Sequence, residues 1–388
     1  MTRFTSSGVP SPKALRIVAL GGAVLVIIAT VLFFGPSQSA RQSTDVALIS
    51  PLPQRDELPL PRSILLTIAV DNIYNCPDDC AFVHELLPPW VRYRYKRMIN
   101  HDPSDLNIHS HTLFVARSIG DPGPLTDWTR RFRKSTNLSV GVLVMADEHN
   151  DHNKTYFPVF DYVLRHYYFP EEHVRALGNL TCGTGPTWPA REDSPLALLA
   201  PPLGVHWALL SPLGPQMAAA HLPNTYWPAS ARDVSCVFVG SAKGREHREK
   251  MAEIMLKAFP DADISMEVNF KGSVGPFEYS HHRLGNAKFA LNPDGTNPEC
   301  HRFSEIVQQG TIPVMVDSPY LHATFSRIPG PVAQSWEEAA VAMQRLIERP
   351  EELDQLQENV MAWARKLKSC ATGDLDKILR KAMSRVSA

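Results

Sequence analysis

The segment 288–316 constrains the fold more than any other part of the chain. It opens with a short apolar run that ends in a loop rich in Pro, Asp and Gly. A helical pattern follows, Gly310 marks its end, and a second apolar run completes the segment. A strand, a glycine-bearing loop, a helix and another strand form the repeating unit of an α/β fold with a parallel sheet.

The same alternation extends over the second half of the chain. We predict strands at 234–239, 263–269, 288–291 and 311–316, and helices at 245–259, 276–287 and 300–309. A capping-box pattern that starts at Ser335 predicts a helix to about Arg349, and a proline at 350 opens a last helix to about Ser369. We expect this half to form one doubly wound domain, residues 231–388.

Continuous apolar runs in the first half are typical of strands that are buried on both faces of a parallel sheet. We predict such strands at 63–70, 112–116, 140–146 and 162–169, with a helix at 126–134. Proline and glycine crowd the segment 178–230, which predicts irregular loops and the crossing between domains. Residues 62–230 are therefore predicted to form another Rossmann-like domain.

Residues 17–34 form an apolar stretch without a charged side chain, and basic residues precede it. A stretch of about 18 apolar residues can span a bilayer, and the positive-inside rule places the tail 1–16 in the cytoplasm. We predict a transmembrane signal anchor, a stem at 35–61 and a lumenal remainder. A cleaved signal peptide is the alternative, because residues 38–40 resemble a small-residue cleavage site.

The composition excludes some classes of function. A net charge of −1 gives no broad basic surface, so nucleic acid is not an expected partner. All six cysteines follow the predicted anchor, which is consistent with disulfides in an oxidising compartment, but their spacing fixes no pairing. Glycosylation sequons at Asn137, Asn153 and Asn179 agree with a lumenal placement without establishing it. The spacing of Cys and His does not suggest zinc, and no metal is predicted.

Arg302 and Glu305 lie one turn apart on the predicted helix 300–309. Ligands of open α/β sheets bind at the carboxyl ends of strands, next to helix N-termini that favour anions. The planar guanidinium of Arg302 suits phosphate oxygens, and the carboxylate of Glu305 can accept hydrogen bonds from ribose hydroxyls. This pattern predicts a site for a nucleotide sugar. The alternative is a solvent-exposed Arg–Glu pair on an amphipathic helix.

The run Cys-x-Arg-Phe-x-Glu-Ile from Cys300, followed by Gly-Thr-Ile-Pro-Val from Gly310, resembles the signature of exostosin-like glycosyltransferases (glycosyltransferase family 47). The resemblance covers residues 234–345. It implies a GT-B fold, in which two Rossmann-like domains face a cleft and the C-terminal domain binds the nucleotide sugar, with terminal helices that pack back across the seam. It also implies inverting chemistry and a Golgi or endoplasmic reticulum address, nearest to the ribitol xylosyltransferase branch. Cys300 and Ile306 replace the usual Ser and Ala, so the sugar does not transfer from the family.

Further donor contacts are predicted at the strand ends of the same domain. The strand 234–239 runs into a turn with Gly240, Lys243 and Arg245, where glycine permits a close approach and a cation can neutralise a diphosphate leaving group. Helix charges that face water are the alternative. Asp294, in the Pro-Asp-Gly loop, either touches the donor sugar or caps the next helix.

Inverting glycosyl transfer also needs a base that takes the proton of the acceptor hydroxyl. Asp147 and Glu148, at the end of the strand 140–146, are the preferred catalytic residues, and Asp71 is a weaker choice. A capped turn that leads into a polar loop explains the first two residues equally well.

These observations predict a membrane-anchored, inverting glycosyltransferase of the Golgi or endoplasmic reticulum. Its co-substrate is expected to be a UDP-sugar, its acceptor a glycan or glycoprotein, and no other cofactor is predicted. Two alternatives stay open. One is a GDP-fucose-dependent transferase, whose donor domain ends in a similar strand, loop and helix. The other is a lumenal binding protein that kept the fold and lost turnover.

Overall fold

The computed structural model describes residues 64–71, 86–98, 103–104, 106–116, 123–144, 154–165, 197–199, 226–242, 244–267, 274–275, 278–295, 300–318 and 328–384. The chain divides into two compact units, Met1–Leu58 and Pro59–Ala388, and every described residue belongs to the second. The predicted anchor 17–34 and stem 35–61 lie outside the described residues. None of the described helices is both long enough and apolar enough to span a bilayer.

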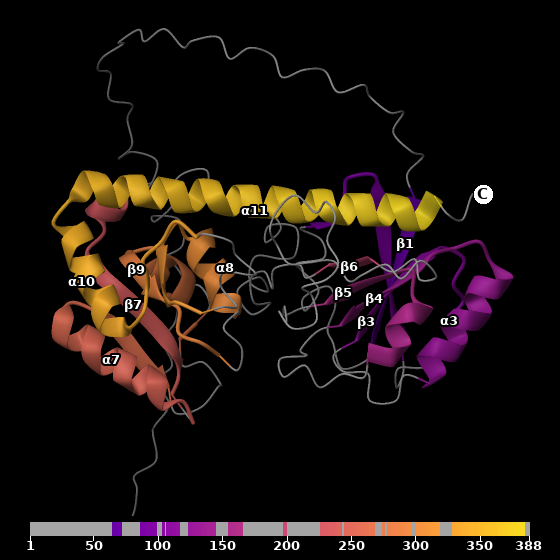
Figure 1. The fold of residues 1–388 in the computed structure, drawn as a ribbon, viewed down its shortest axis with the longest axis horizontal. Helices are drawn as coiled ribbons and strands as arrows, with labels where there is room; N and C mark the ends of the chain where they lie inside the picture. The colour runs from indigo at the N-terminus through magenta and orange to yellow at the C-terminus, as the bar shows by residue number, and fades with distance from the viewer. Residues whose placement is uncertain are drawn as a thin grey trace, which may run out of the picture. The chain divides into compact units, whose positions relative to one another are not determined.

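The first sheet contains six parallel strands in the order β2-β1-β3-β4-β5-β6 within the described part of the chain. The strands are β1 (Ile64–Asp71), β2 (Val91–Met98), β3 (His111–Ala116), β4 (Val140–Val144), β5 (Tyr162–Arg165) and β6 (Ala197–Leu199). The helix α3 (Gly123–Ser135) connects β3 to β4 and lies beside these strands in Figure 1. The four strands and the helix that the sequence predicts in this half are confirmed.

Both faces of β1 are buried from Leu66 to Val70. On β1, Leu66, Ile68 and Val70 join one hydrophobic cluster, whereas Ala69 joins a second cluster with Trp128 of α3. Neighbouring residues join different clusters because successive side chains of a strand point to opposite faces. Each fully buried Leu or Ile stabilises the fold by about 1.5–3 kcal/mol relative to an exposed one. Burial on both faces explains why β1 is a continuous apolar run.

The sequence pattern does not predict β2 or β6. β2 reads Val-Arg-Tyr-Arg-Tyr-Lys-Arg-Met and is an edge strand of the first sheet, paired with β1. An edge strand buries less of its surface, so β2 lacks the apolar run that marks a central strand. β6 falls within 178–230, so the prediction that this segment is wholly irregular is wrong.

The second sheet has five parallel strands in the order β11-β10-β9-β7-β8 among the described residues. They are β7 (Val234–Ser241), β8 (Asp263–Glu267), β9 (Ala287–Leu291), β10 (Ile312–Val316) and β11 (Val332–Ala333). The helices are α7 (Glu246–Ala258), the π-helix η4 (Glu278–Leu284), α8 (His301–Gln308) and α10 (Trp336–Ile347). The predicted strands and the helices that became α7, α8 and α10 are confirmed, the helix predicted at 276–287 is a shorter π-helix, and β11 was not predicted.

The helices α7 and α8 cover opposite faces of the second sheet. Parallel connections are right-handed, so a helix that leads from β7 outward to β8 and one that leads from β9 outward to β10 lie on different faces. Accordingly, Phe238 of β7 packs in one cluster with Met251 of α7, whereas Val237 packs in another with Ile306 of α8. Both helices begin at the carboxyl edge of this sheet.

The last helix, α11 (Pro350–Ser384), is longer than predicted and contributes to two cores. Leu353 and Met361 belong to the cluster of the second sheet, whereas Leu375 and Leu379 belong to a cluster of the first. The predicted end near Ser369 is wrong. Gly373 lies inside α11. A glycine inside a helix costs about 1 kcal/mol, which is less than the free energy gained when the apolar side chains that follow it are buried. Figure 1 shows α11 as one continuous yellow helix.

A buried polar network fixes the turn between α8 and β10. Gly310 has a φ of 64°, in the left-handed region, and a Cβ there would lie 2.6 Å from Cγ of Tyr226. Its carbonyl oxygen accepts hydrogen bonds from Arg232 Nη2 at 3.0 Å and from Gln357 Nε2 at 2.6 Å. Arg232 and Gln357 are both buried. The predicted end of the helix at Gly310 is confirmed, and the network ties α11 to the start of β10.

Candidate functional site

Arg302 reaches over the carboxyl end of β7 from the first turn of α8. Its Cζ lies 4.7 Å from the ring centroid of Phe238, and its Nη2 donates a hydrogen bond to the carbonyl oxygen of Val239 at 3.2 Å. Its Nε is buried and has no hydrogen-bond partner among the described residues. A buried donor without a partner costs about 1–3 kcal/mol, so a ligand oxygen that pairs with it removes that cost.

Gly240 leaves the space that Arg302 occupies. A Cβ at this position would lie 2.7 Å from Arg302 Nη2 and 2.9 Å from Phe238 Cζ. The sequence predicts that glycine here allows a close approach, and the group that approaches is the guanidinium of Arg302. Gly240 is therefore a residue that positions Arg302, while a direct contact between Gly240 and the donor stays a prediction.

Arg248 joins Arg302 from the first turn of α7. It is 3% exposed, and its Nε and Nη2 donate to the carbonyl oxygen of Asp294 at 3.1 Å and 2.8 Å. Its Nη1 donates to the carbonyl oxygen of Ser241 at 2.8 Å. Burial lowers the pKa of Arg248, and the positive charges of Arg302 and Arg245 lower it further. Arg248 therefore lies near two other arginines at this edge, and an anion that binds there relieves the repulsion on Arg248.

Glu305 faces inward on α8. It is 8% exposed, and its Oε2 accepts a hydrogen bond from the hydroxyl of Tyr279 on η4 at 3.2 Å. Burial raises the pKa of Tyr279 well above its usual value, and the charge of Glu305 raises it further. The alternative of a solvent-exposed Arg–Glu pair is wrong, because Glu305 is buried and Arg302 extends to β7. The proposed contact between Glu305 and a ribose stays a prediction.

Cys300 precedes α8 as its N-cap residue and is a free thiol. Its Sγ donates a hydrogen bond to Oδ1 of Asn292 at 3.0 Å. Burial raises the pKa of the Cys300 thiol, and the charge of Arg302 opposes this effect only in part. The thiol is therefore neutral at physiological pH, and it fastens the start of α8 to the loop after β9. Asp294 does not cap α8, so that interpretation is wrong.

The loop after β9 borders a cavity of about 340 Å³. This volume lies at the lower end of the range for small-molecule sites, about 300–1,000 Å³. The lining residues come from α7, from the ends of β9 and β10, and from the start of α10: His247, Lys250, Ile254, Pro293, Asp294, Val316, Asp317, Gln334, Ser335, Trp336 and Glu337. The cavity thus offers one large aromatic ring among carboxylate and amide groups.

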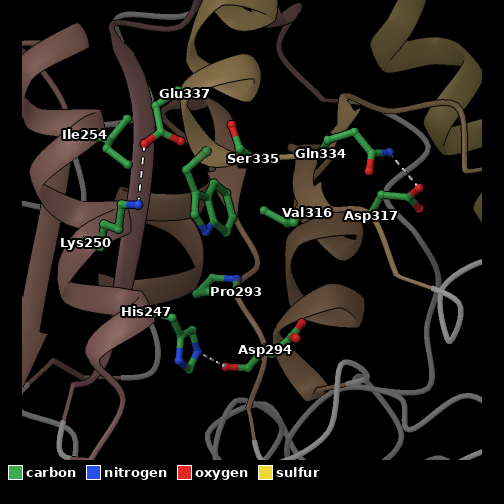
Figure 2. A pocket seen from close by; sticks show the side chains of 11 residues that line it. His247, Lys250, Ile254, Pro293, Asp294, Val316, Asp317, Gln334, Ser335 and Glu337 are labelled. Carbon is green, nitrogen blue, oxygen red and sulfur yellow. Dashed lines mark hydrogen bonds and ion pairs between the residues drawn. The ribbon is translucent and has the colours of Figure 1, made fainter.

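Polar pairs shape the wall of this cavity, as Figure 2 shows. Lys250 Nζ lies 3.8 Å from Glu337 Oε1, and Gln334 Nε2 donates to Asp317 Oδ2 at 2.9 Å. His247 Nε2 lies 3.2 Å from the carbonyl oxygen of Asp294, the same oxygen that Arg248 binds. The cavity and the arginine cluster are therefore adjacent and share the backbone of the loop after β9.

The remaining predicted site residues have different outcomes. Arg245 is the N-cap residue of α7 and lies close enough to Arg248 to affect its pKa. Lys243, Asp147 and Glu148 lie outside the described residues, as does the side chain of Asp71. The described residues contain no group of three or more His, Cys, Asp or Glu side chains that could hold a metal ion.

Sequence reasoning did not select four residues of this site, namely His247, Arg248, Tyr279 and Trp336. A signal existed for Arg248, because it lies three residues before Met251 on the face of α7 that carries the buried methionines. A charged residue on a buried face needs a partner or a ligand. No comparable signal marks the other three.

No family model matches the chain, and no curated protein matches it. The exostosin-like resemblance therefore has no support from a family match. Among solved structures, the chain is similar to an α1,3-fucosyltransferase at 13% identity and a TM-score of 0.40, over 79% of this chain and 90% of that chain.

It is also similar to an O-GlcNAc transferase mutant from Thermobaculum terrenum, at 13% identity and a TM-score of 0.42, over 84% of this chain and 69% of that one. A third structure, a GtfA/B complex, aligns at 14% identity and a TM-score of 0.44, over 72% of this chain and 59% of that one. Values this low do not establish a shared activity.

Proposed function

We propose that this protein is a glycosyltransferase whose arginine cluster binds the diphosphate of a nucleotide-sugar donor. The observation that carries the proposal is the buried, unpartnered Nε of Arg302, placed beside Arg248 at the carboxyl ends of β7 and β9. Each hydrogen bond from a guanidinium to a phosphate oxygen is worth about 1.5–3 kcal/mol. A diphosphate bound there satisfies Arg302 and neutralises the crowded positive charge.

The surroundings favour a nucleotide sugar over a simple phosphate. Glu305 supplies a carboxylate one turn along α8 from Arg302, which suits ribose hydroxyls. The adjacent cavity supplies Trp336 as an apolar surface, with Asp317 and Gln334 as hydrogen-bonding groups. A neutral ring with many hydroxyls needs this mixture of aromatic and polar contacts. We therefore assign the cavity to the glycosyl group.

The reaction follows from these roles. A hydroxyl oxygen of the acceptor attacks the anomeric carbon, a carboxylate takes the hydroxyl proton, and the bond between the anomeric carbon and the phosphate oxygen breaks. The bonding electrons leave with the nucleoside diphosphate, where Arg248 and Arg302 stabilise the developing charge. Asp147 and Glu148 remain the proposed bases, and the anomeric configuration inverts.

The finer features of the proposal rest on the sequence. An exostosin-like donor pattern supports a UDP-sugar as co-substrate, and the apolar segment 17–34 supports a type II membrane protein of the Golgi or endoplasmic reticulum. A glycan or glycoprotein is the proposed acceptor. The proposed GDP-fucose alternative differs in the nucleotide, which makes the two separable by binding.

The test is a calorimetric titration of the full-length chain in detergent with UDP, GDP, uridine and guanosine. We expect one nucleoside diphosphate to bind at micromolar concentration and its nucleoside to bind at least about 100-fold more weakly, because two or more charge-assisted hydrogen bonds are lost. Stronger binding of UDP supports the UDP-sugar, and stronger binding of GDP supports the fucosyltransferase alternative. Failure of both diphosphates to bind at millimolar concentration contradicts the proposal.

A further inference from the structure

The edge strand β2 carries a row of cations that the donor site does not use. Arg92, Arg94 and Lys96 occupy alternate positions and so share one face of the strand, opposite Leu65, Thr67 and Ala69 of β1. Arg92 and Arg94 are exposed, and Lys96 is half-buried. Alternate residues of a strand lie about 6.5–7 Å apart, so the three charges form a regular line.

Two of these side chains are held in place by the fold. Arg94 Nε donates a hydrogen bond to Oγ1 of Thr67 at 3.1 Å, and Thr67 Oγ1 lies 2.6 Å from Oγ of Ser110. Lys96 Nζ donates to the carbonyl oxygen of Asn107. Thr67 and Ser110 are buried. The cations are therefore oriented before any partner arrives, which lowers the entropic cost of binding.

No carboxylate compensates this row within the part of the chain that the structure describes. None of Arg92, Arg94 and Lys96 forms an ion pair there. On α3, by contrast, Arg130 lies 2.9 Å from Asp127 and Arg133 lies 2.7 Å from Asp161. The whole chain has 39 basic and 40 acidic residues, so the excess of positive charge on β2 is local.

Charges on an edge strand also protect it from pairing with another chain, and lysine is the usual residue for that purpose. Protection requires only charge. It does not require guanidinium groups, which match the geometry of carboxylate and sulfate oxygens, or side chains that are anchored to buried hydroxyls. The row on β2 has both features.

We propose that β2 binds an acidic glycan chain through its sulfate or carboxylate groups. A single line of three cations fits a thin, extended polyanion whose charges are spaced along its length. Duplex nucleic acid and an anionic membrane both need a wider basic surface, and the net charge of −1 provides none. This inference does not depend on the donor site.

The test is binding of the full-length chain to chondroitin sulfate oligosaccharides of defined length, with dextran as the uncharged control. The variant R92Q/R94Q/K96Q removes the row, and R130Q/R131Q/K134Q removes the same charge from α3. We expect the β2 variant to lose at least about 30-fold in affinity and to show a weaker dependence on salt. The α3 variant is expected to stay within about twofold of the wild type, since its charges lie elsewhere.

Two further variants serve as controls for folding and for side-chain geometry. If the triple variant unfolds, R92Q alone replaces it, because Arg92 has no hydrogen bond that the fold depends on within the described residues, and a threefold or greater loss is expected. R92K/R94K keeps the positive charges but removes the planar guanidinium groups. Its affinity should therefore lie between those of the wild type and the triple variant. Equal losses in the β2 and α3 variants, absence of binding, or tighter binding to duplex DNA or phosphatidylserine vesicles would overturn the proposal.

Discussion

The start of α8 and the strand β2 both gather cations, but they do so in opposite environments. Arg302 is partly buried, lies over an aromatic ring and has a buried Nε without a partner. Arg92 and Arg94 are exposed on an edge strand. A buried guanidinium with an unsatisfied donor has a destabilising cost that a small anion can remove, whereas an exposed row gains little until a long polyanion engages several charges together. The first environment selects a small ligand and the second a polymer.

The largest expected effect belongs to Arg302→Ala. Nucleoside diphosphate affinity should fall at least about 100-fold, because two charge-assisted hydrogen bonds of about 1.5–3 kcal/mol each are lost. The melting temperature should change by only a few degrees, because the lost hydrogen bond to Val239 and the lost contact with Phe238 oppose the removal of an unsatisfied donor and of the repulsion on Arg248. Calorimetry and thermal unfolding measure both quantities. Binding of chondroitin sulfate should not change. If the variant loses affinity for both ligands, the two regions do not bind them independently.

Gly240→Ala should have the next largest effect. The new Cβ would lie 2.7 Å from Arg302 Nη2, so the guanidinium must move away from the end of β7. We expect nucleotide affinity to fall by about 10- to 50-fold, which corresponds to the loss of roughly one good charge-assisted hydrogen bond. A double-mutant cycle with Arg302→Ala is the control. If Gly240→Ala weakens binding as much without Arg302 as with it, Gly240 does not act by positioning Arg302.

Trp336→Ala should distinguish the contribution of the sugar to binding from that of the diphosphate. The ring lines the cavity assigned to the glycosyl group, so its loss should weaken a nucleotide sugar by about 5- to 10-fold, the value of one aromatic contact of roughly 1–1.5 kcal/mol. The corresponding nucleoside diphosphate should bind almost unchanged. Competition titrations with the two ligands give the ratio. An equal loss for both ligands places the cavity outside the glycosyl subsite.

Cys300→Ser should have the smallest effect among these changes. A serine hydroxyl can replace the hydrogen bond to Asn292, so nucleotide affinity should stay within about threefold. The wild-type thiol should resist iodoacetamide at pH 8 in the folded protein, because burial raises its pKa and the thiolate is the reactive form. Mass spectrometry of the Cys300 peptide measures this. Rapid modification contradicts the half-buried, neutral thiol.

The sequence predicts the second sheet well because its signals are local. The apolar strands, the helix that carries Arg302 and Glu305, and the stop at Gly310 all follow from residues within a few positions of one another. The role of Arg248 is different, since its partner oxygen on Asp294 is 46 residues away and only the fold brings them together. Local patterns reveal which helix is buried, but they do not reveal what its charged residues touch.

The first sheet shows a second reason for failure. β2 alternates cations with tyrosines, so it lacks the apolar run that identifies β1. Its strand conformation depends on the ladder with β1, which is a tertiary feature. Likewise, α11 extends past its predicted end near Ser369 because residues on both sides of Gly373 are buried in hydrophobic cores, which is a tertiary feature.

A crystal structure of the chain with a nucleoside diphosphate tests the central claim most directly. The diphosphate should lie at the carboxyl ends of β7 and β9, with a phosphate oxygen about 2.7–2.9 Å from Arg302 Nε, the usual length of a charge-assisted hydrogen bond. A second phosphate oxygen should lie within the same distance of the guanidinium of Arg248 or Arg245. A diphosphate bound elsewhere, with Arg302 Nε still buried and unpartnered, would contradict the assignment of this edge as the donor site.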